Sequence, residues 1–250
     1  MTDIIAHRGS KGTRPENTLL AFKEASECGV DGIELDVQLT KDKQVVVIHD
    51  EKVDRTTDGV GYVEQMMLHE IKSLDAGSWF SPDYKNERIP LFKEVLTLLK
   101  ELDFNGFLNI EFKTDKIQYE GIEKLVIKEL EDTKFENKVI FSSFSKKTIA
   151  NLEALHLNGA KAFISHGWLS DQRYLSREKE ITGYHPKLSW IKRREKWLCE
   201  LNQEVRPWTV NKEEDMRWCL NHHLSGFFTD FPRKAIEVKR IWKSNKLSSL

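Results

Sequence analysis

The sequence predicts an α/β protein, a (β/α)8 barrel of the TIM type with a small insertion after the extended run that ends at His49-Asp50. Short apolar runs alternate with helix-like segments along nearly the whole chain, which predicts a parallel sheet. About eight strand–helix units in 250 residues fit a barrel better than an open doubly wound sheet. The chain also lacks the glycine-rich loop motifs of nucleotide-binding folds. We therefore expect one barrel domain over residues 1–250.

The first part of the chain shows the alternation clearly. Extended runs are expected at residues 3–7, 32–36 and 44–48, and a helix at 17–28. In that helix Leu19, Leu20, Phe22 and Ala25 recur at helical spacing, and Gly29 suits its C-terminal end.

Residues 51–90 interrupt the alternation with turn-rich segments such as Asp58-Gly59-Val60-Gly61 and Ser81-Pro82-Asp83. We interpret this stretch as a loop-rich insertion. A loop region of this length is more often functional than a simple connector.

The alternation resumes after the insertion. Strands are expected at 106–110, 138–141, 161–164, 184–186, 205–210 and 227–229. Helices are expected at 91–102, 119–133, 146–157, 189–202, 212–222 and 232–243. Residues 166–183 are polar and ambiguous, and we interpret them as loop-like.

Composition limits the classes of function. Lys plus Arg number 39 and Asp plus Glu 40, and the formal net charge of -1 argues against nucleic acid as the main partner. No run approaches the ~18 apolar residues of a membrane span, so we expect no integral membrane association. The N-terminus lacks the pattern of a secretory leader, which favours a cytoplasmic protein.

Charged side chains and imidazoles stand at the ends of the expected strands, where catalytic residues of such barrels lie. Glu34 and Asp36 are two residues apart, so they share one face of a strand, and Glu111 lies on another strand. Three carboxylates converging at a barrel mouth repel one another unless a cation lies between them. An all-oxygen cluster favours one hard divalent cation, Mg²⁺ or Ca²⁺.

Two histidines and two positively charged side chains accompany these acids. His7 and His49 can serve as general acid and general base. Arg8 and Lys113 suit the oxygens of a phosphate group. These residue types together indicate metal-assisted cleavage of a phosphodiester.

At this point the sequence resembles the glycerophosphodiester phosphodiesterases. The matching motifs, in chain order, are His7-Arg8-Gly9, Pro15-Glu16-Asn17-Thr18, Glu34-x-Asp36, His49-Asp50, Glu111-x-Lys113, Trp208-Thr209-Val210-Asn211 and Thr229-Asp230-x-Pro232. The resemblance runs from residue 4 to about residue 235, and residues 166–187 are its least typical part.

The resemblance implies a barrel that hydrolyses small glycerophosphodiesters to glycerol 3-phosphate and an alcohol, in glycerol and lipid metabolism. It implies Glu34, Asp36 and Glu111 as metal ligands, His7 and His49 as the acid–base pair, and Arg8 and Lys113 as phosphate contacts. Glu16 and Asn17 match the motif that supports the site in this family. Residues 51–90 resemble the small insertion that caps the barrel mouth in this family.

Four of these positions allow two readings from the sequence. Asp50 either orients His49 or caps a turn, and Asn17 supports the site or caps a helix. Glu16 pairs with Arg8 or contacts the substrate. Trp208 either lines the substrate pocket or packs in the core.

Two alternative functions remain open at this stage. The first is phospholipase-D-like cleavage of lysolipids on the same barrel. The second is a non-catalytic binding protein on a degenerate barrel, although no expected site residue is missing from the sequence.

Overall fold

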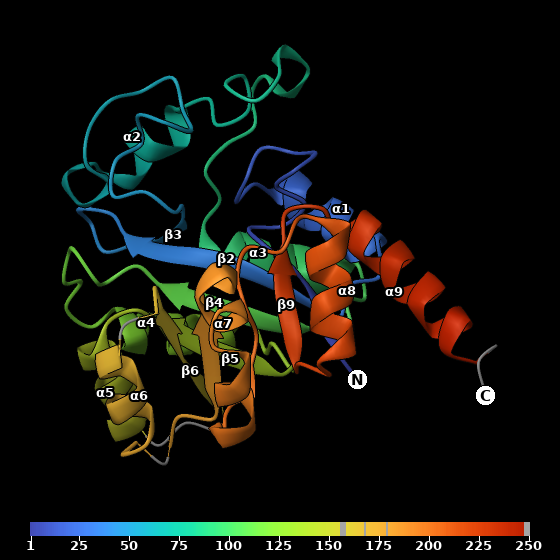
Figure 1. Ribbon diagram of the computed structural model, residues 1–250. Coiled ribbons are helices and arrows are strands. Elements are labelled where there is room, and N and C mark those ends of the chain that lie inside the picture. The colour runs from blue at the N-terminus through green and yellow to red at the C-terminus, as the bar shows by residue number, and fades with distance from the viewer. Residues whose placement is uncertain (156–158, 168, 179, 248–250) are drawn as a thin grey trace.

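The computed structural model describes residues 1–155, 159–167, 169–178 and 180–247, and it shows a nearly closed barrel of eight parallel strands (Figure 1). In chain order the strands are β1 (Asp3–Ala6), β2 (Gly32–Leu39), β4 (Phe107–Phe112), β5 (Val139–Ser143), β6 (Ala160–Ser165), β7 (Gly183–Pro186), β8 (Glu204–Val205) and β9 (Gly226–Thr229). Their order around the sheet is β8-β7-β6-β5-β4-β2-β1-β9. This arrangement confirms the predicted fold class.

Two backbone hydrogen bonds join β9, the last strand of that order, to the segment that follows β8, the first. The Phe228 N–H donates to the carbonyl of Pro207 at 3.0 Å, and the Val210 N–H donates to the carbonyl of Phe228 at 2.8 Å. The segment after β8 therefore meets β9, although β8 itself contains only two residues. The Arg206 and Trp208 N–H groups still donate to β7 carbonyls beyond the assigned end of β8. The regular ladder is broken where Pro186 of β7 lacks an N–H, and β8 is therefore shorter than the extended run expected to reach residue 210.

A helix follows each strand unit on the outside of the barrel. These helices are α1 (Leu19–Glu27), α3 (Phe92–Glu101), α4 (Ile122–Asp132), α5 (Lys146–Ala154), α6 (Leu169–Leu175), α7 (Leu188–Lys192), α8 (Glu213–Asn221) and α9 (Pro232–Leu247). In α3 the residues Phe92, Val95, Leu96 and Leu99 are buried, which is the 3-4 spacing of one apolar face. Figure 1 shows α8 and α9 side by side near the two chain ends.

Residues 166–183 were interpreted as a loop, and this was wrong because they contain α6. Tyr174 and Leu175 pack against the barrel core. The expected helix at 146–157 is α5, which ends at Ala154, and residues 156–157 lie outside the described part of the chain.

The single helix expected at 189–202 is instead α7 followed by the 3-10 segment η3 (Glu195–Glu200). Trp190 and Trp197 would be about 10 Å apart along a continuous helix. The break brings their ring centroids to 5.1 Å, and both rings contact Tyr184 edge to face. Aromatic packing therefore outweighs helix continuity here.

The insertion at residues 51–90 follows β3 (Val45–Val47), which pairs antiparallel with β2. It is less loop-like than expected, because it holds η1 (Val63–Gln65), α2 (Leu68–Ser73) and η2 (Pro82–Tyr84). Its buried apolar side chains form a separate small cluster with those of Val46 and Ile48. Figure 1 shows α2 and its loops standing clear of the other helices.

Among the helices of the described residues, none combines the length and the apolar composition that crossing a bilayer requires.

Candidate active site

Three carboxylates meet at the carboxyl ends of β2 and β4. Glu34 and Asp36 lie on the same face of β2, and strand register places Asp36 directly opposite Glu111 of β4. One ligand oxygen from each residue lies within 4.8 Å of the others. Glu34 and Asp36 are almost fully buried, and Glu34 Oε1 and Asp36 Oδ1 have no hydrogen-bond partner among the described residues. The structure thus brings together the three acids that the sequence singled out.

The electrostatics of this cluster suit a cation. Burial raises the pKa of Glu34 well above its ordinary value, and the charges of Asp36 and Glu111 raise it further. Burial also acts to raise the pKa of Asp36, but the charges of His49, Arg8 and Lys113 outweigh it and lower that pKa. Adjacent buried carboxylates resist joint ionisation unless positive charge lies between them. An all-oxygen donor set with unpartnered oxygens fits a hard divalent ion such as Mg²⁺ or Ca²⁺.

The loop after β1 places Arg8 against these acids. Its backbone N–H donates to Glu34 at 2.7 Å, and its guanidinium donates to Glu16 at 2.7 Å. Its Nε forms an ion pair of 3.3 Å with Asp36. The loop packs tightly on α1: Gly9 has φ +75°, and a Cβ there would lie 2.7 Å from the carbonyl carbon of Ala21. Only glycine fits that close approach.

Each histidine of the site is held by an aspartate. His7 Nδ1 lies 2.7 Å from Asp230 Oδ1, and His49 Nδ1 lies 2.6 Å from Asp50 Oδ1. An ionised carboxylate only accepts, so both Nδ1 atoms carry a proton, and Nε2 is the ring atom left to exchange a proton with a ligand. Burial, aided by the nearby charge of Arg8, lowers the pKa of His7 to about 4 despite the bond to Asp230.

Lys113 connects the second histidine to the acids. Its Nζ lies 2.9 Å from Glu111 Oε1 and 3.3 Å from His49 Nε2. Burial acts to lower the pKa of Lys113, but Glu111 and Asp36 outweigh it and raise that pKa. The lysine therefore remains a cation beside the carboxylate cluster.

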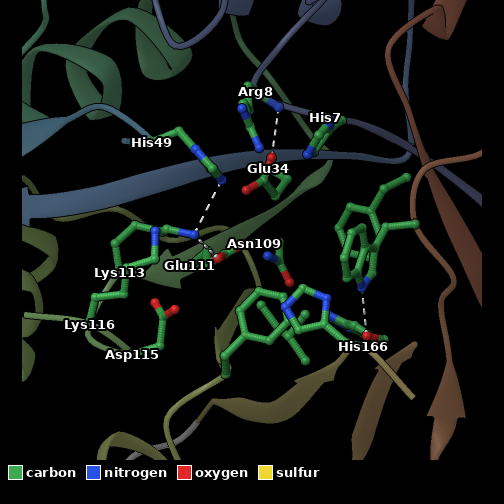
Figure 2. Close-up of a pocket in the computed structure, with 15 residues that line it drawn as sticks. His7, Arg8, Glu34, His49, Asn109, Glu111, Lys113, Asp115, Lys116 and His166 are labelled. Atoms are coloured by element: carbon green, nitrogen blue, oxygen red, sulfur yellow. Dashed lines mark hydrogen bonds and ion pairs between the residues drawn. The ribbon is translucent and has the colours of Figure 1, made fainter. Parts of the chain in front are cut away.

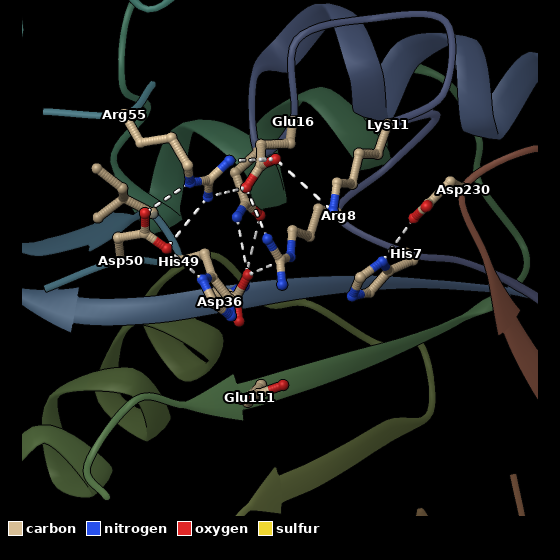
Figure 3. Close-up of polar contacts among 12 residues, drawn as sticks. His7, Arg8, Lys11, Glu16, Asp36, His49, Asp50, Arg55, Glu111 and Asp230 are labelled. Atoms are coloured by element: carbon tan, nitrogen blue, oxygen red, sulfur yellow. Dashed lines mark hydrogen bonds and ion pairs between the residues drawn. The ribbon is translucent and has the colours of Figure 1, made fainter. Parts of the chain in front are cut away.

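A network beside the site comes partly from the insertion (Figure 3). Arg55 donates to both carboxylate oxygens of Glu16, at 2.9 and 2.7 Å, and to both of Asp50, at 2.6 and 3.1 Å. Glu16 in turn accepts from Arg8. The Arg55 hydrogen bond and the charge of Arg8 outweigh burial and lower the pKa of Glu16 to about 2. Arg55 thus links the loop after β1 to the partner of His49.

A cavity of about 320 Å³ opens between these groups, in the range of small-ligand sites (Figure 2). Its wall consists of His7, Arg8, Glu34, His49, Asn109, Glu111, Lys113, Asp115, Lys116, Phe144, Ile164, His166, His185, Trp208 and Phe228. Trp208 packs edge to face against Phe144 and His166, and its indole N–H donates to the His185 carbonyl at 2.9 Å. Trp208 thus lies in the cavity wall, and its contact with substrate stays a prediction.

Glu16, Asn17 and Asp50 lie behind the lining residues. Asn17 donates from Nδ2 to Asp36 at 2.8 Å, and Thr18, rather than Asn17, caps α1. Glu16 bonds two arginines, and a direct contact between Glu16 and substrate stays a prediction.

Sequence reasoning missed several residues of the site. Arg55 carries no periodic signal because it lies in an irregular loop. Asp230 stands in the matching motif Thr229-Asp230-x-Pro232 and directly follows the last strand, but it was given no role. It also accepts from Asn211 at 2.7 Å. The cavity residues Asn109 and His185 were given no role, although both lie on strands that were expected.

The pocket at the mouth of this parallel barrel is surrounded by acids, cationic side chains and two histidine–aspartate pairs. This combination is typical of enzymes that cleave phosphodiesters. Comparison with known proteins agrees. The model of the glycerophosphoryl diester phosphodiesterase family matches residues 7–234. The chain belongs to this family.

Individual relatives match over nearly their whole length. A glycerophosphodiester phosphodiesterase of Caldanaerobacter subterraneus is 40% identical over 96% of this chain and 98% of its own. One from Bacillus altitudinis is 37% identical over 97% of this chain and 100% of its own. The solved structure of an Oleispira antarctica phosphodiesterase, in complex with the product sn-glycerol-3-phosphate, superposes with a TM-score of 0.83. It is 30% identical and the match covers 96% of this chain and 97% of that one.

Proposed function

We propose that this protein hydrolyses glycerophosphodiesters to glycerol 3-phosphate and an alcohol, with a divalent cation and two histidines acting together. The observation that carries the proposal is the convergence of three carboxylates, two cations and two histidine–aspartate pairs on one cavity. The product bound in the Oleispira antarctica phosphodiesterase supports this substrate class.

Glu34, Asp36 and Glu111 are the residues that would hold one Mg²⁺ or Ca²⁺ ion, because their oxygens converge and two of them lack other partners. Such an ion, when bound, supplies charge neutralisation and polarises a phosphate oxygen.

Arg8 and Lys113 bind the remaining phosphate oxygens. Both line the cavity and both stay charged at neutral pH. Glu16 and Asn17 position this arrangement from behind, through Arg8 and Asp36 respectively. A cation held rigidly by such bonds can stabilise charge that develops on a phosphate with little reorganisation.

The two histidines move the protons. The nucleophile, water or the neighbouring glycerol hydroxyl, loses its proton to Nε2 of one histidine as its oxygen attacks phosphorus. The phosphorus–oxygen bond to the leaving alcohol breaks, and the other histidine, protonated at Nε2, gives its proton to that alcohol. Attack by water gives glycerol 3-phosphate directly. Attack by the glycerol hydroxyl gives a cyclic phosphodiester, which water then opens in a second step in which the two histidines exchange roles. Asp230 and Asp50 fix the ring orientations and stabilise each imidazolium.

Neither alternative function gains support from the structure. The catalytic set is complete, which argues against a degenerate barrel. The cavity volume of about 320 Å³ suits a small diester rather than an intact lysolipid.

Replacement of each histidine tests the acid–base proposal. We expect His7→Ala and His49→Ala each to lower kcat by roughly 10²–10⁴-fold on glycerophosphocholine, the usual range for one acid–base group. His69→Ala, an exposed histidine of α2, is the matched control and retains turnover. Near-normal kcat in both site variants, with melting temperatures unchanged, would refute the acid–base assignment.

A further inference from the structure

Two polar side chains at the closed end of the cavity have no role in the chemistry described above. Asn109 on β4 and His185 on β7 both line the cavity, and each is only 1% exposed. By comparison, the side chain of Glu111 is 12% exposed and that of His49 is 29% exposed. Asn109 precedes Glu111 by two residues on the same face of β4, so it lies one pleat deeper in the barrel.

Both side chains present unpartnered polar atoms. Asn109 donates from Nδ2 to Ser142 Oγ at 2.9 Å, which fixes the amide and leaves Oδ1 without a partner among the described residues. Neither ring nitrogen of His185 has a partner there either. Buried polar atoms are nearly always hydrogen-bonded in folded proteins, so two such side chains in one cavity wall indicate a ligand contact.

The protonation state of His185 defines what it can bind. Burial, together with the charge of Arg206, lowers its pKa well below the ordinary value, so the ring is neutral. A neutral imidazole offers one N–H donor and one acceptor, and Asn109 Oδ1 offers an acceptor. This pair matches a hydroxyl group, which both donates and accepts, and it discriminates against a purely apolar group.

We propose that Asn109 and His185 form a hydroxyl-recognition subsite for the polyol arm of the substrate, and so determine specificity on the side of the phosphate that remains esterified. The proposal rests on the proposed function above. With phosphorus held at Arg8 and Lys113, the polyol arm extends to the closed end. Its terminal hydroxyl donates to Asn109 Oδ1 and accepts from the His185 N–H, while Ile164 and Phe228 contact its carbon atoms.

In the same geometry, the departing alcohol lies at the open end of the cavity. The wall there includes the side chains of Asp115 and Lys116, which follow β4. We therefore expect discrimination for the polyol arm and tolerance for the departing alcohol.

A pair of substrates tests the subsite directly. One is glycerophosphocholine, and the other is the matching phosphocholine diester of propane-1,2-diol, which keeps the hydroxyl next to the ester and lacks the terminal one. We expect the wild-type enzyme to prefer the glycerol substrate by roughly 10–100-fold in kcat/KM, because its buried polar groups lose their partner with the analogue. His185→Leu and Asn109→Leu should reduce this preference to within about threefold, by lowering turnover of the glycerol substrate alone.

Two further variants separate recognition from packing. His185→Gln keeps a donor and an acceptor and should retain part of the preference. His69→Leu makes the same substitution at an exposed histidine outside the cavity, so it should leave the preference intact. Melting temperatures establish that each variant is folded.

Two results would count against the subsite in different ways. A wild-type enzyme that hydrolyses both substrates, with a preference that survives both leucine substitutions, would overturn the subsite and leave the proposed function standing. A folded wild-type protein that turns over neither substrate would overturn the proposed function on which the subsite rests.

Discussion

Arg55 illustrates how one side chain can organise a site that it does not line. It bonds both oxygens of Glu16 and both oxygens of Asp50, and these acids hold Arg8 and His49. A planar guanidinium can bridge two carboxylates in this way, whereas the ammonium of lysine acts as a point charge. The insertion therefore reaches His49 through Asp50.

Replacement of Arg55 by lysine tests this positioning role. Arg55→Lys should lower kcat by roughly 10–100-fold with a smaller effect on KM, because the residue orients His49 and does not touch substrate. Steady-state kinetics on glycerophosphocholine measure both constants, and Arg88→Lys in the same insertion is the control. An unchanged kcat in Arg55→Lys would show that Asp50 holds His49 without it.

At the residue scale, the sequence predicted the groups that stand at strand ends. Glu34, Asp36 and Glu111 could be placed together because carboxyl ends of parallel strands share one rim. Arg55 could not be paired with Glu16, and Asp230 could not be paired with His7, because these partners lie 39 and 223 residues away in the chain. Local patterns contain no information about such contacts.

At the scale of single elements, α4 carries an acid in an unfavourable position. Glu129 Oε2 is buried without a hydrogen-bond partner among the described residues. Burial raises the pKa of Glu129 from 4.5 to about 7. The folded protein therefore binds more protons than the unfolded chain between pH 4.5 and 7, so stability falls as the pH rises through this range.

Glu129→Gln should remove this loss of folding stability at higher pH. The pKa difference corresponds to about 3 kcal/mol, which solvent screening of this partly exposed group reduces to about 1 kcal/mol. The variant should therefore be more stable than wild type at pH 8 and equal to it at pH 4, as measured by urea unfolding. The exposed neighbour Glu131→Gln should show no such pH-dependent gain. Equal stability of wild type and Glu129→Gln at pH 8 would refute the burial cost.

The elements themselves were predictable where one apolar face is continuous. The helix expected at 91–102 is α3, whose buried residues follow a strict helical spacing. The segment containing α6 was not predictable because it is polar and short. The break between α7 and η3 depends on the contact of Trp190 and Trp197 with Tyr184, which is a tertiary effect.

At the scale of the whole molecule, closure of the barrel assembles the site. Pairing of β1 with β9 places His7 beside Asp230, so the two ends of the chain complete one histidine–aspartate pair. Pairing of β2 with β4 completes the carboxylate cluster. The sequence predicted eight strand–helix units, and the general rule for such barrels placed the site at their carboxyl ends.

The central claim is that the carboxylate cluster holds a divalent cation that turnover of glycerophosphodiesters requires. Its most direct test measures glycerol 3-phosphate release and melting temperature in EDTA, and after addition of Mg²⁺ or Ca²⁺. The test compares wild type with Glu111→Gln and with the exposed control Glu120→Gln. We predict that EDTA abolishes release, that one ion restores it and raises the melting temperature, and that Glu111→Gln loses at least roughly 10²-fold. Full release in EDTA, or normal release by Glu111→Gln, would contradict the account.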